Sequence, residues 1–229
     1  MQYESVSPAL FVSRPNRFIA NVELDGRLRE CHVKNTGRCK ELLLPGVKVY
    51  VNKTSNPNRR TKYDLISACK GDMLVNMDSQ APNKVVQEWI KTNGVRGKPV
   101  TGLKPEYRFG DSRMDFYAET SKDKYLIEVK GVTLEEDGTA MFPDAPTERG
   151  VRHINELIKS ADMGYLPMII FVIQMDTVRV FKPNRKTHPE FGEALRKARE
   201  KGVRIIAMDC HVTADTLELK DEIPINLEG

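Results

Sequence analysis

Apolar and polar residues alternate over short runs in the first third of the chain, and such alternation is typical of half-buried strands. The runs cover residues 10–12, 18–24, 28–33, 47–51, 65–68 and 73–75. Turn-forming residues separate them, among them Asp25-Gly26 and Leu44-Pro45-Gly46. Many short strands at close spacing predict a small β-barrel, which we place over residues 1–80.

A different pattern follows residue 80. An apolar stripe formed by Val85, Val86, Trp89 and Ile90 predicts a helix over residues 82–92. Strands are then predicted at 107–109, 113–118 and 125–129, followed by a helix at 147–163, strands at 168–173 and 177–181, a helix at 189–201 and a strand at 203–208. Hairpins followed by alternating helices and strands predict a mixed α/β domain with a central sheet over residues 81–229.

Chain length and apolar runs narrow the class of protein. The chain has 229 residues, enough to bury a core without disulfide staples. Its longest apolar run, residues 168–173, is far shorter than the roughly 20 residues that a membrane helix needs. The first residues are polar and acidic, unlike a signal peptide. We therefore expect a soluble, cytoplasmic protein that does not enter a membrane.

The four cysteines are scattered without the paired spacing of a metal-binding motif. A zinc site could be assembled from Cys31, His32, Cys39 and Cys69, but nothing in their spacing requires it. We interpret these residues, together with Cys210, as free thiols in a reducing compartment.

Basic residues are concentrated in the predicted barrel. Residues 1–80 carry 13 basic and 8 acidic side chains, whereas the whole chain carries 36 and 32. Such a surplus favours binding to nucleic-acid phosphates, and a basic five-stranded barrel is typical of the oligonucleotide-binding (OB) fold. The alternative is a solvated basic face with no partner. Candidate nucleic-acid-binding residues in this part are Arg14, Arg17, Arg38, Arg59, Arg60 and Lys62.

One hairpin of the second domain carries residues that could perform chemistry. If residues 120–123 form its loop, Asp115 lies directly across from Glu128, and Lys130 shares their face. Met114 and Phe116 would then point to the buried face. Two carboxylates and an ammonium on the exposed face suit Mg²⁺ or Mn²⁺, with Lys130 orienting an attacking water. The alternative is a cross-strand salt bridge around Lys130 that has no function.

This Asp…Glu-x-Lys arrangement resembles the motif of the PD-(D/E)xK nuclease superfamily. The blocks FPDAPTERG at 142–150 and IEVKGVTL at 127–134 are long enough to be specific. With them, the chain resembles the sugar fermentation stimulation protein A family, from about Arg14 to the C-terminal strands. Further blocks that carry this resemblance are RFIA at 17–20, NTGR at 35–38, ELLLPG at 41–46 and SRMDF at 112–116.

The resemblance implies an N-terminal OB-fold and a C-terminal PD-(D/E)xK nuclease-like α/β domain. It also implies DNA binding of low sequence specificity and a link to the regulation of sugar metabolism, chiefly of maltose. Asp115, Glu128 and Lys130 fall on the nuclease motif, and Glu88 lies where that superfamily often has a further metal-binding carboxylate. Glu106 is a second candidate. Lys34 stands where the family often has proline, and Cys39 where it often has a larger apolar residue.

The leading hypothesis is a DNA-binding protein with a metal-dependent phosphodiesterase site. Asp115 and Glu128 would hold the metal, Lys130 would activate water, and Arg149 and His153 would contact the phosphate. One alternative is a regulatory DNA-binding protein without catalysis, and a more distant one is a regulator that binds a sugar or metabolite. The sequence leaves open whether the substrate is single- or double-stranded, and whether the chain forms a homodimer.

Overall fold

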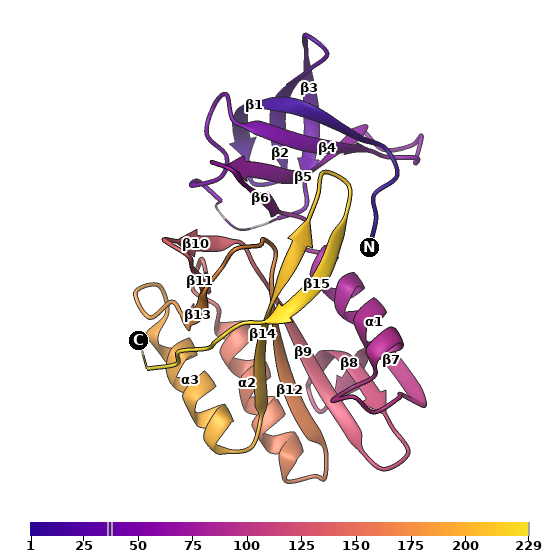
Figure 1. Cartoon of the computed structure of the whole chain (residues 1–229), viewed down its shortest axis with the longest axis vertical. Coiled ribbons are helices and arrows are strands. Elements are labelled where there is room, and N and C mark those ends of the chain that lie inside the picture. Colours follow the sequence, from indigo (N-terminus) through magenta and orange to yellow (C-terminus); the bar gives the residue numbers. More distant parts are fainter. Residues whose placement is uncertain (36, 38, 229) are drawn as a thin grey trace.

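An N-terminal barrel forms the upper part of the molecule in Figure 1, a computed structural model that describes residues 1–35, 37 and 39–228. Within these residues its strands are β1 (Val6–Asn16), β2 (Ile19–Leu24), β3 (Arg27–Val33), β4 (Lys48–Lys53), β5 (Tyr63–Lys70) and β6 (Met73–Asn76). They lie in the order β3-β2-β1-β4-β5-β6, and pairing of β3 with β5 closes the barrel. Alternate residues such as Val49 and Val51 are fully buried, which explains the alternation in the sequence. The predicted OB-like barrel is confirmed.

The second domain is built on a mixed sheet in the order β15-β14-β12-β9-β8-β7. Its strands are β7 (Gly102–Phe109), β8 (Ser112–Glu119), β9 (Lys124–Val132), β12 (Leu166–Ile173), β14 (Arg204–Val212) and β15 (Leu217–Glu222). Central strand β12 is apolar along its length because it is covered on both faces. Ile169 and Phe171 belong to one apolar core, and Met168 and Ile170 to another.

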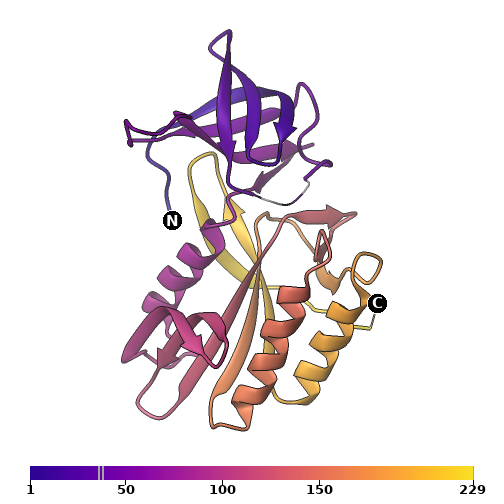
Figure 2. The same cartoon turned by 180° about the vertical axis from the view of Figure 1, so that it is seen from behind.

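The helices α1 (Ala81–Asn93), α2 (Glu148–Ala161) and α3 (Pro189–Glu200) cover these two faces. Residues of α1 pack with Met168 and Ile170, whereas residues of α2 and α3 pack with Ile169 and Phe171. Figure 2 shows α2 and α3 in front of the sheet and α1 at its side. Among the described residues, none of the helices is long and apolar enough to cross a membrane. The predicted mixed α/β domain is confirmed.

Several strands differ from the prediction. The strands β10 (Leu134–Glu136), β11 (Thr139–Phe142) and β15 were not predicted, and the strand expected at 177–181 is β13 (Val180–Pro183). β10, β11 and β13 form a small separate sheet, and β15 is an edge strand with the charged sequence LELKDE. Short or edge strands expose most of their side chains, so they leave little apolar pattern in the sequence.

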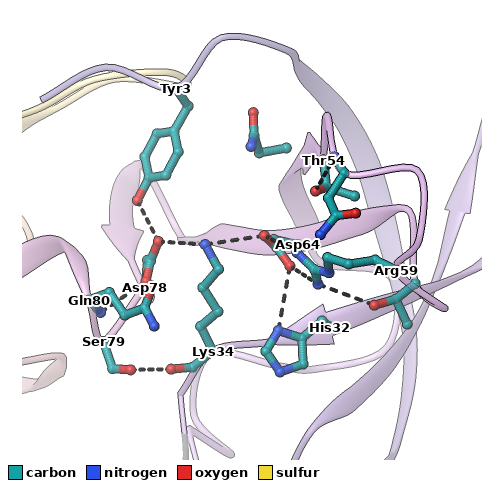
Figure 3. A network of polar contacts seen from close by, with 12 residues as sticks. Tyr3, His32, Lys34, Thr54, Arg59, Asp64, Asp78, Ser79 and Gln80 are labelled. Carbon is teal, nitrogen blue, oxygen red and sulfur yellow. Dashed lines mark hydrogen bonds and ion pairs between the residues drawn. The ribbon is translucent and has the colours of Figure 1, made fainter.

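A buried polar network lies at the neck between the two domains (Figure 3). Lys34, directly after β3, places its Nζ 3.1 Å from Asp64 Oδ2 and 3.3 Å from Asp78 Oδ2. Arg59 also contacts Asp64, with nitrogen–oxygen distances of 2.6 and 3.0 Å. Tyr3 donates its hydroxyl hydrogen to Asp78. Because Asp78 is fully buried and Asp64 nearly so, both carboxylates depend on these partners.

Further polar contacts fix the barrel on the second domain. Lys70 at the end of β5 forms an ion pair of 2.6 Å with Glu135 of β10. Gln174, which follows β12, donates to the side chain of Asn76 at 2.9 Å. The amino group of Met1 donates to the carbonyl of Leu217 at 2.7 Å, so the start of the chain lies against β15. These contacts hold the barrel loops beside the end of the central sheet.

Candidate active site

The hairpin of β8 and β9 has the register that the sequence predicts. Phe116 pairs with Ile127 and Glu119 with Lys124, and the Thr120 amide donates to the Asp123 carbonyl at 2.9 Å. One step further along this register, Asp115 lies opposite Glu128. There the regular ladder ends, because the Val129 amide donates to the Asp115 side chain at 2.7 Å.

The strand β8 changes its facing at Asp115, so the prediction that Met114 and Phe116 share one buried face is wrong. Phe116 packs in the core beside α1, whereas Met114 packs in the other core, with residues of α2. Glu106 lies on the neighbouring strand β7 and has a left-handed backbone with φ of 50°. Its neighbours Pro105 and Tyr107 pair with β8, whereas Glu106 does not. A residue in this conformation interrupts the regular alternation of a strand pair. At this level the Asp115 carboxylate contacts the Val129 amide and the Asn83 side chain.

Both oxygens of Asp115 are held by the protein. Oδ2 accepts from Val129, and Oδ1 accepts from the side-chain amide of Asn83 on the first turn of α1 at 2.8 Å. Burial raises the pKa of Asp115, and the nearby charge of Glu128 raises it further, because both disfavour the ionised form. Asn83 is not among the site residues predicted from the sequence, because no spacing in the chain links it to Asp115.

Glu128 is only 2% exposed and lies beneath α2, which corrects the expectation that these side chains occupy an exposed face. His153 of α2 places Nδ1 2.6 Å from Glu128 Oε1, and the Lys130 ammonium contacts the same oxygen. Arg149, one turn earlier on α2, donates from Nε to His153 Nε2 at 3.3 Å. Because Nε2 accepts this hydrogen bond, Nδ1 carries the proton that is donated to Glu128.

The second oxygen of Glu128 is buried and has no hydrogen-bond partner among the described residues. Burial alone would raise the pKa of Glu128, but the hydrogen bond from His153 and the charge of Lys130 outweigh it and lower the pKa. A buried, ionised carboxylate with a free oxygen beside a second carboxylate can bind a cation. The two oxygen donors, with water and a phosphate completing the shell, fit Mg²⁺ or Mn²⁺.

Glu88 and Glu106 are not brought to this cluster. Glu88 forms an ion pair of 2.8 Å with the amino group of Met1, and Glu106 forms an exposed pair of 3.0 Å with Arg113. In the part of the chain that the structure describes, no three His, Cys, Asp or Glu side chains are grouped as metal ligands. Among the described residues, a cation here would have Asp115 and Glu128 as its carboxylate ligands, and Cys31, His32, Cys39 and Cys69 are not grouped as metal ligands.

Several basic residues predicted to bind nucleic acid are used inside the protein. Arg14 donates to the carbonyls of Asn35 and Gly37 at 2.8 and 3.0 Å, and Arg59 is bound to Asp64. Lys62 donates to the carbonyl of Pro57 at 2.6 Å. Arg17 and Arg60 are exposed, and Arg38 lies outside the described residues. His153 has both ring nitrogens occupied, which leaves neither of them free for the predicted phosphate contact.

A cleft of about 180 Å³ opens between the barrel and the end of β9. Asn35, Gly37 and Ser79 line it from the barrel side, and Gly131 and Asp144 from the second domain. Gly131 follows Lys130 directly. A β-carbon at residue 131 would lie 2.5 Å from the side-chain oxygen of Gln174, so this close approach requires glycine. The barrel loop that contains Asn35 and Gly37 thus lines the same cleft as Gly131, the residue next to Lys130.

Asn83→Ala is expected to weaken Mn²⁺ binding about 10–100-fold, because the outer hydrogen bond that orients Asp115 is lost. Calorimetric titration with Mn²⁺ would measure this change. Gln87→Ala, one turn further along α1, is the matched control and should leave the affinity unchanged. Equal Mn²⁺ affinity in Asn83→Ala and the wild type would contradict a positioning role for Asn83.

The fold and the site define a class of protein: an OB-like barrel joined to a mixed α/β domain whose central hairpin carries an Asp, Glu and Lys cluster. The family description "SfsA N-terminal OB domain" matches residues 12–77, and "Sugar fermentation stimulation protein RE domain" matches residues 80–216. The chain belongs to the sugar fermentation stimulation protein family.

Relatives match over their full length. The sugar fermentation stimulation protein homologue of Ruminiclostridium cellulolyticum is 56% identical over 99% of this chain and 100% of its own. That of Clostridium beijerinckii is 53% identical with the same coverage. The solved structure of Pyrococcus furiosus SfsA in complex with Ca²⁺ is 32% identical, covers 99% of this chain and 98% of its own, and has a TM-score of 0.88.

Proposed function

We propose that the protein is a DNA-binding phosphodiesterase that depends on Mg²⁺ or Mn²⁺ and has low sequence specificity. The observation that carries the proposal is the buried second oxygen of Glu128, which has no hydrogen-bond partner among the described residues, beside the held carboxylate of Asp115. The buried carboxylate of Glu128 and the half-buried carboxylate of Asp115 repel each other and anionic ligands unless a cation lies between them. That a relative has been solved with Ca²⁺ supports a cation site of oxygen ligands.

Each residue of the cluster has a distinct role in this mechanism. When bound, Mg²⁺ would supply Lewis-acid chemistry at the phosphoryl group. Asp115 and Glu128 would hold the ion, while the hydrogen bonds from Asn83 and Val129 fix the orientation of Asp115. The ammonium of Lys130 is only partly buried. In this mechanism it moves away from Glu128, and it then orients the attacking water or offsets charge in the transition state.

His153 and Arg149 act behind Glu128. The proton on His153 Nδ1 is directed at Glu128 Oε1, which fixes that oxygen and leaves the other for the cation. Arg149 lies at the start of α2. It donates a hydrogen bond to His153 and is also exposed to solvent. It is therefore the member of the pair that can reach a substrate phosphate.

Exposed arginines on the β7–β8 hairpin support binding to phosphates. Arg108 lies directly opposite Arg113, and both are exposed. Two like charges directly opposite each other destabilise a strand pair. Glu106 forms an ion pair with Arg113, but this pair is exposed to solvent and compensates little of the repulsion. A DNA backbone beside Asp115 would neutralise both guanidinium groups. Arg17 and Arg60 of the barrel are further exposed arginines that we assign to phosphate binding in this proposal.

The deciding experiment is a cleavage assay on single-stranded, double-stranded and flapped DNA. Mg²⁺, Mn²⁺ and EDTA are compared, with Asp115→Asn as the inactive variant. We expect metal-dependent cutting of at least one substrate form by the wild type only. Cutting that persists in EDTA, or in Asp115→Asn at the wild-type rate, would contradict the proposed site.

A non-catalytic regulatory DNA-binding protein is the second candidate. The observation that favours it is the contact of Lys130 with Glu128, which occupies the ammonium when no cation is bound. Salt-sensitive binding without cutting of any DNA form would establish this function. Either activity would suit a protein of the cytoplasm, and either could connect DNA binding with the regulation of sugar metabolism that the family name suggests. A homodimer would suit a nuclease that cuts both strands.

A further inference from the structure

A second cleft, of about 460 Å³, opens at the neck on the side where the N-terminal segment runs. Figure 1 shows this segment descending from the barrel towards α1, away from β10 and β11. Residues of the N-terminal segment form one wall, the end of β4 forms another, and Lys84 of α1 a third. Its polar lining includes Lys34, Asn52, Lys53, Thr54, Asp64 and Lys84.

The floor of this cleft is the network around Lys34. Figure 3 shows Lys34 between Asp64 and Asp78, with Tyr3 and Thr54 on either side of the space above. An ammonium has three N–H donors, and the two carboxylates use two of them. Both oxygens of Asp64 are already engaged, because Arg59 contacts each of them. Two cations and two carboxylates balance one another, so the floor itself carries little net charge.

The walls add positive charge and hydrogen-bond donors. Lys53 and Lys84 are exposed, and neither ammonium has an ion-pair or hydrogen-bond partner among the described residues. Asn52 accepts a hydrogen bond from the Ser5 amide through Oδ1, which leaves its amide hydrogens for a ligand. Thr54 accepts through Oγ1 from the Asn56 amide, which leaves its hydroxyl hydrogen. Among its described lining residues, the cleft therefore presents donors and no unengaged carboxylate other than the exposed Glu4.

We infer that this cleft binds a phosphate group, held by Lys53 and Lys84 above the partly buried Lys34. Lysine ammonium groups suit the compact charge of phosphate, and neutral amide and hydroxyl donors complete its hydrogen bonds. The volume lies within the range of roughly 300–1,000 Å³ typical of small-molecule sites, so a nucleotide fits as well as a single phosphate. The phosphate can come from a free nucleotide or from the backbone of a nucleic acid.

Titrations of the full-length protein in EDTA test this site without a metal at Asp115. The probes are pyrophosphate, ADP and a short oligothymidylate. Their binding is measured by calorimetry and by the change in melting temperature. A probe at 100 times its Kd should raise the melting temperature by about 5 °C or more. The variant Lys53→Gln/Lys84→Gln should bind at least about tenfold more weakly, because two charge-assisted hydrogen bonds are lost. The control Lys91→Gln/Lys122→Gln removes two exposed lysines elsewhere and should bind like the wild type.

The arms of the experiment also identify the source of the phosphate. Tighter binding of ADP than of the oligonucleotide supports a free nucleotide, whereas the reverse order supports a nucleic-acid backbone. Absence of binding to all three probes, or equal affinity in the cleft variant and the lysine control, would overturn the inference. Failure of DNA cleavage would leave it intact, because these titrations need neither the metal nor Asp115.

Discussion

Asp115→Asn is expected to lower metal-dependent cleavage by at least about 10³-fold, equivalent to roughly 4 kcal/mol of transition-state stabilisation. The substitution removes one of the two carboxylates that would hold the cation, while the shape of the side chain stays the same. The amide oxygen of the substituted side chain can still accept from Val129, and rotation of the Asn83 amide restores the second hydrogen bond. DNA binding should persist or tighten, since a negative charge near the phosphates has gone.

The same variant should be at least as stable as the wild type without metal. Burial and the charge of Glu128 raise the pKa of Asp115 in the folded state above its ordinary value. A raised folded-state pKa means that the ionised form costs stability, and this cost grows as the pH rises from the ordinary pKa to the raised one. Asparagine removes it, so the melting temperature in EDTA should stay equal or rise by up to about 4 °C.

Asp111→Asn, at the exposed tip of the neighbouring hairpin, is the matched control for charge. It should change neither the cleavage rate nor the melting temperature. A large loss of stability in Asp115→Asn would indicate that this carboxylate is structural, and cleavage at the rate of the control would remove it from the active site.

Lys34→Met is expected to lower the free energy of unfolding by about 3–5 kcal/mol, because it leaves buried carboxylates without their shared cation. Methionine fills a similar volume, so the loss is one of charge. Asp64 keeps Arg59, whereas within the described part of the chain the Asp78 carboxylate keeps only the Tyr3 hydroxyl at 3.3 Å and the Gln80 amide at 2.9 Å. Urea unfolding measures the change, with the exposed Lys53→Met as control. A loss below about 1 kcal/mol would contradict this role for Lys34.

The acid sensitivity of the protein should change in the same variant. In the wild type, burial alone would raise the pKa of Asp64, but Arg59 and Lys34 outweigh it and hold the pKa below its ordinary value. A lowered folded-state pKa contributes stability above the ordinary value and loses it as the pH falls through the lowered one. Without Lys34 the pKa of Asp64 rises, so acid unfolding should begin at a higher pH. Asp78→Asn added to Lys34→Met should restore part of the lost stability.

Local sequence determined the elements and the central hairpin. Alternation of apolar residues predicted the barrel strands, and the helical stripes predicted α1, α2 and α3 to within a few residues at each end. The four-residue loop at 120–123 was enough to place Asp115 across from Glu128, because strand register follows from loop length. These are properties of contiguous segments, and neighbouring residues carry the information.

Tertiary structure alone decided the environment of that hairpin. Asn83 reaches Asp115, and α2 buries Glu128, through packing of segments that lie more than 20 residues apart in the chain. Glu88 forms an ion pair with the amino group of Met1 instead of joining the cluster. Arg14 and Arg59 bind to acceptors within the protein. A charge in a sequence shows only that a cation or anion is present. Whether it faces solvent or a partner depends on which distant segment covers it, and that is fixed only when the domains pack.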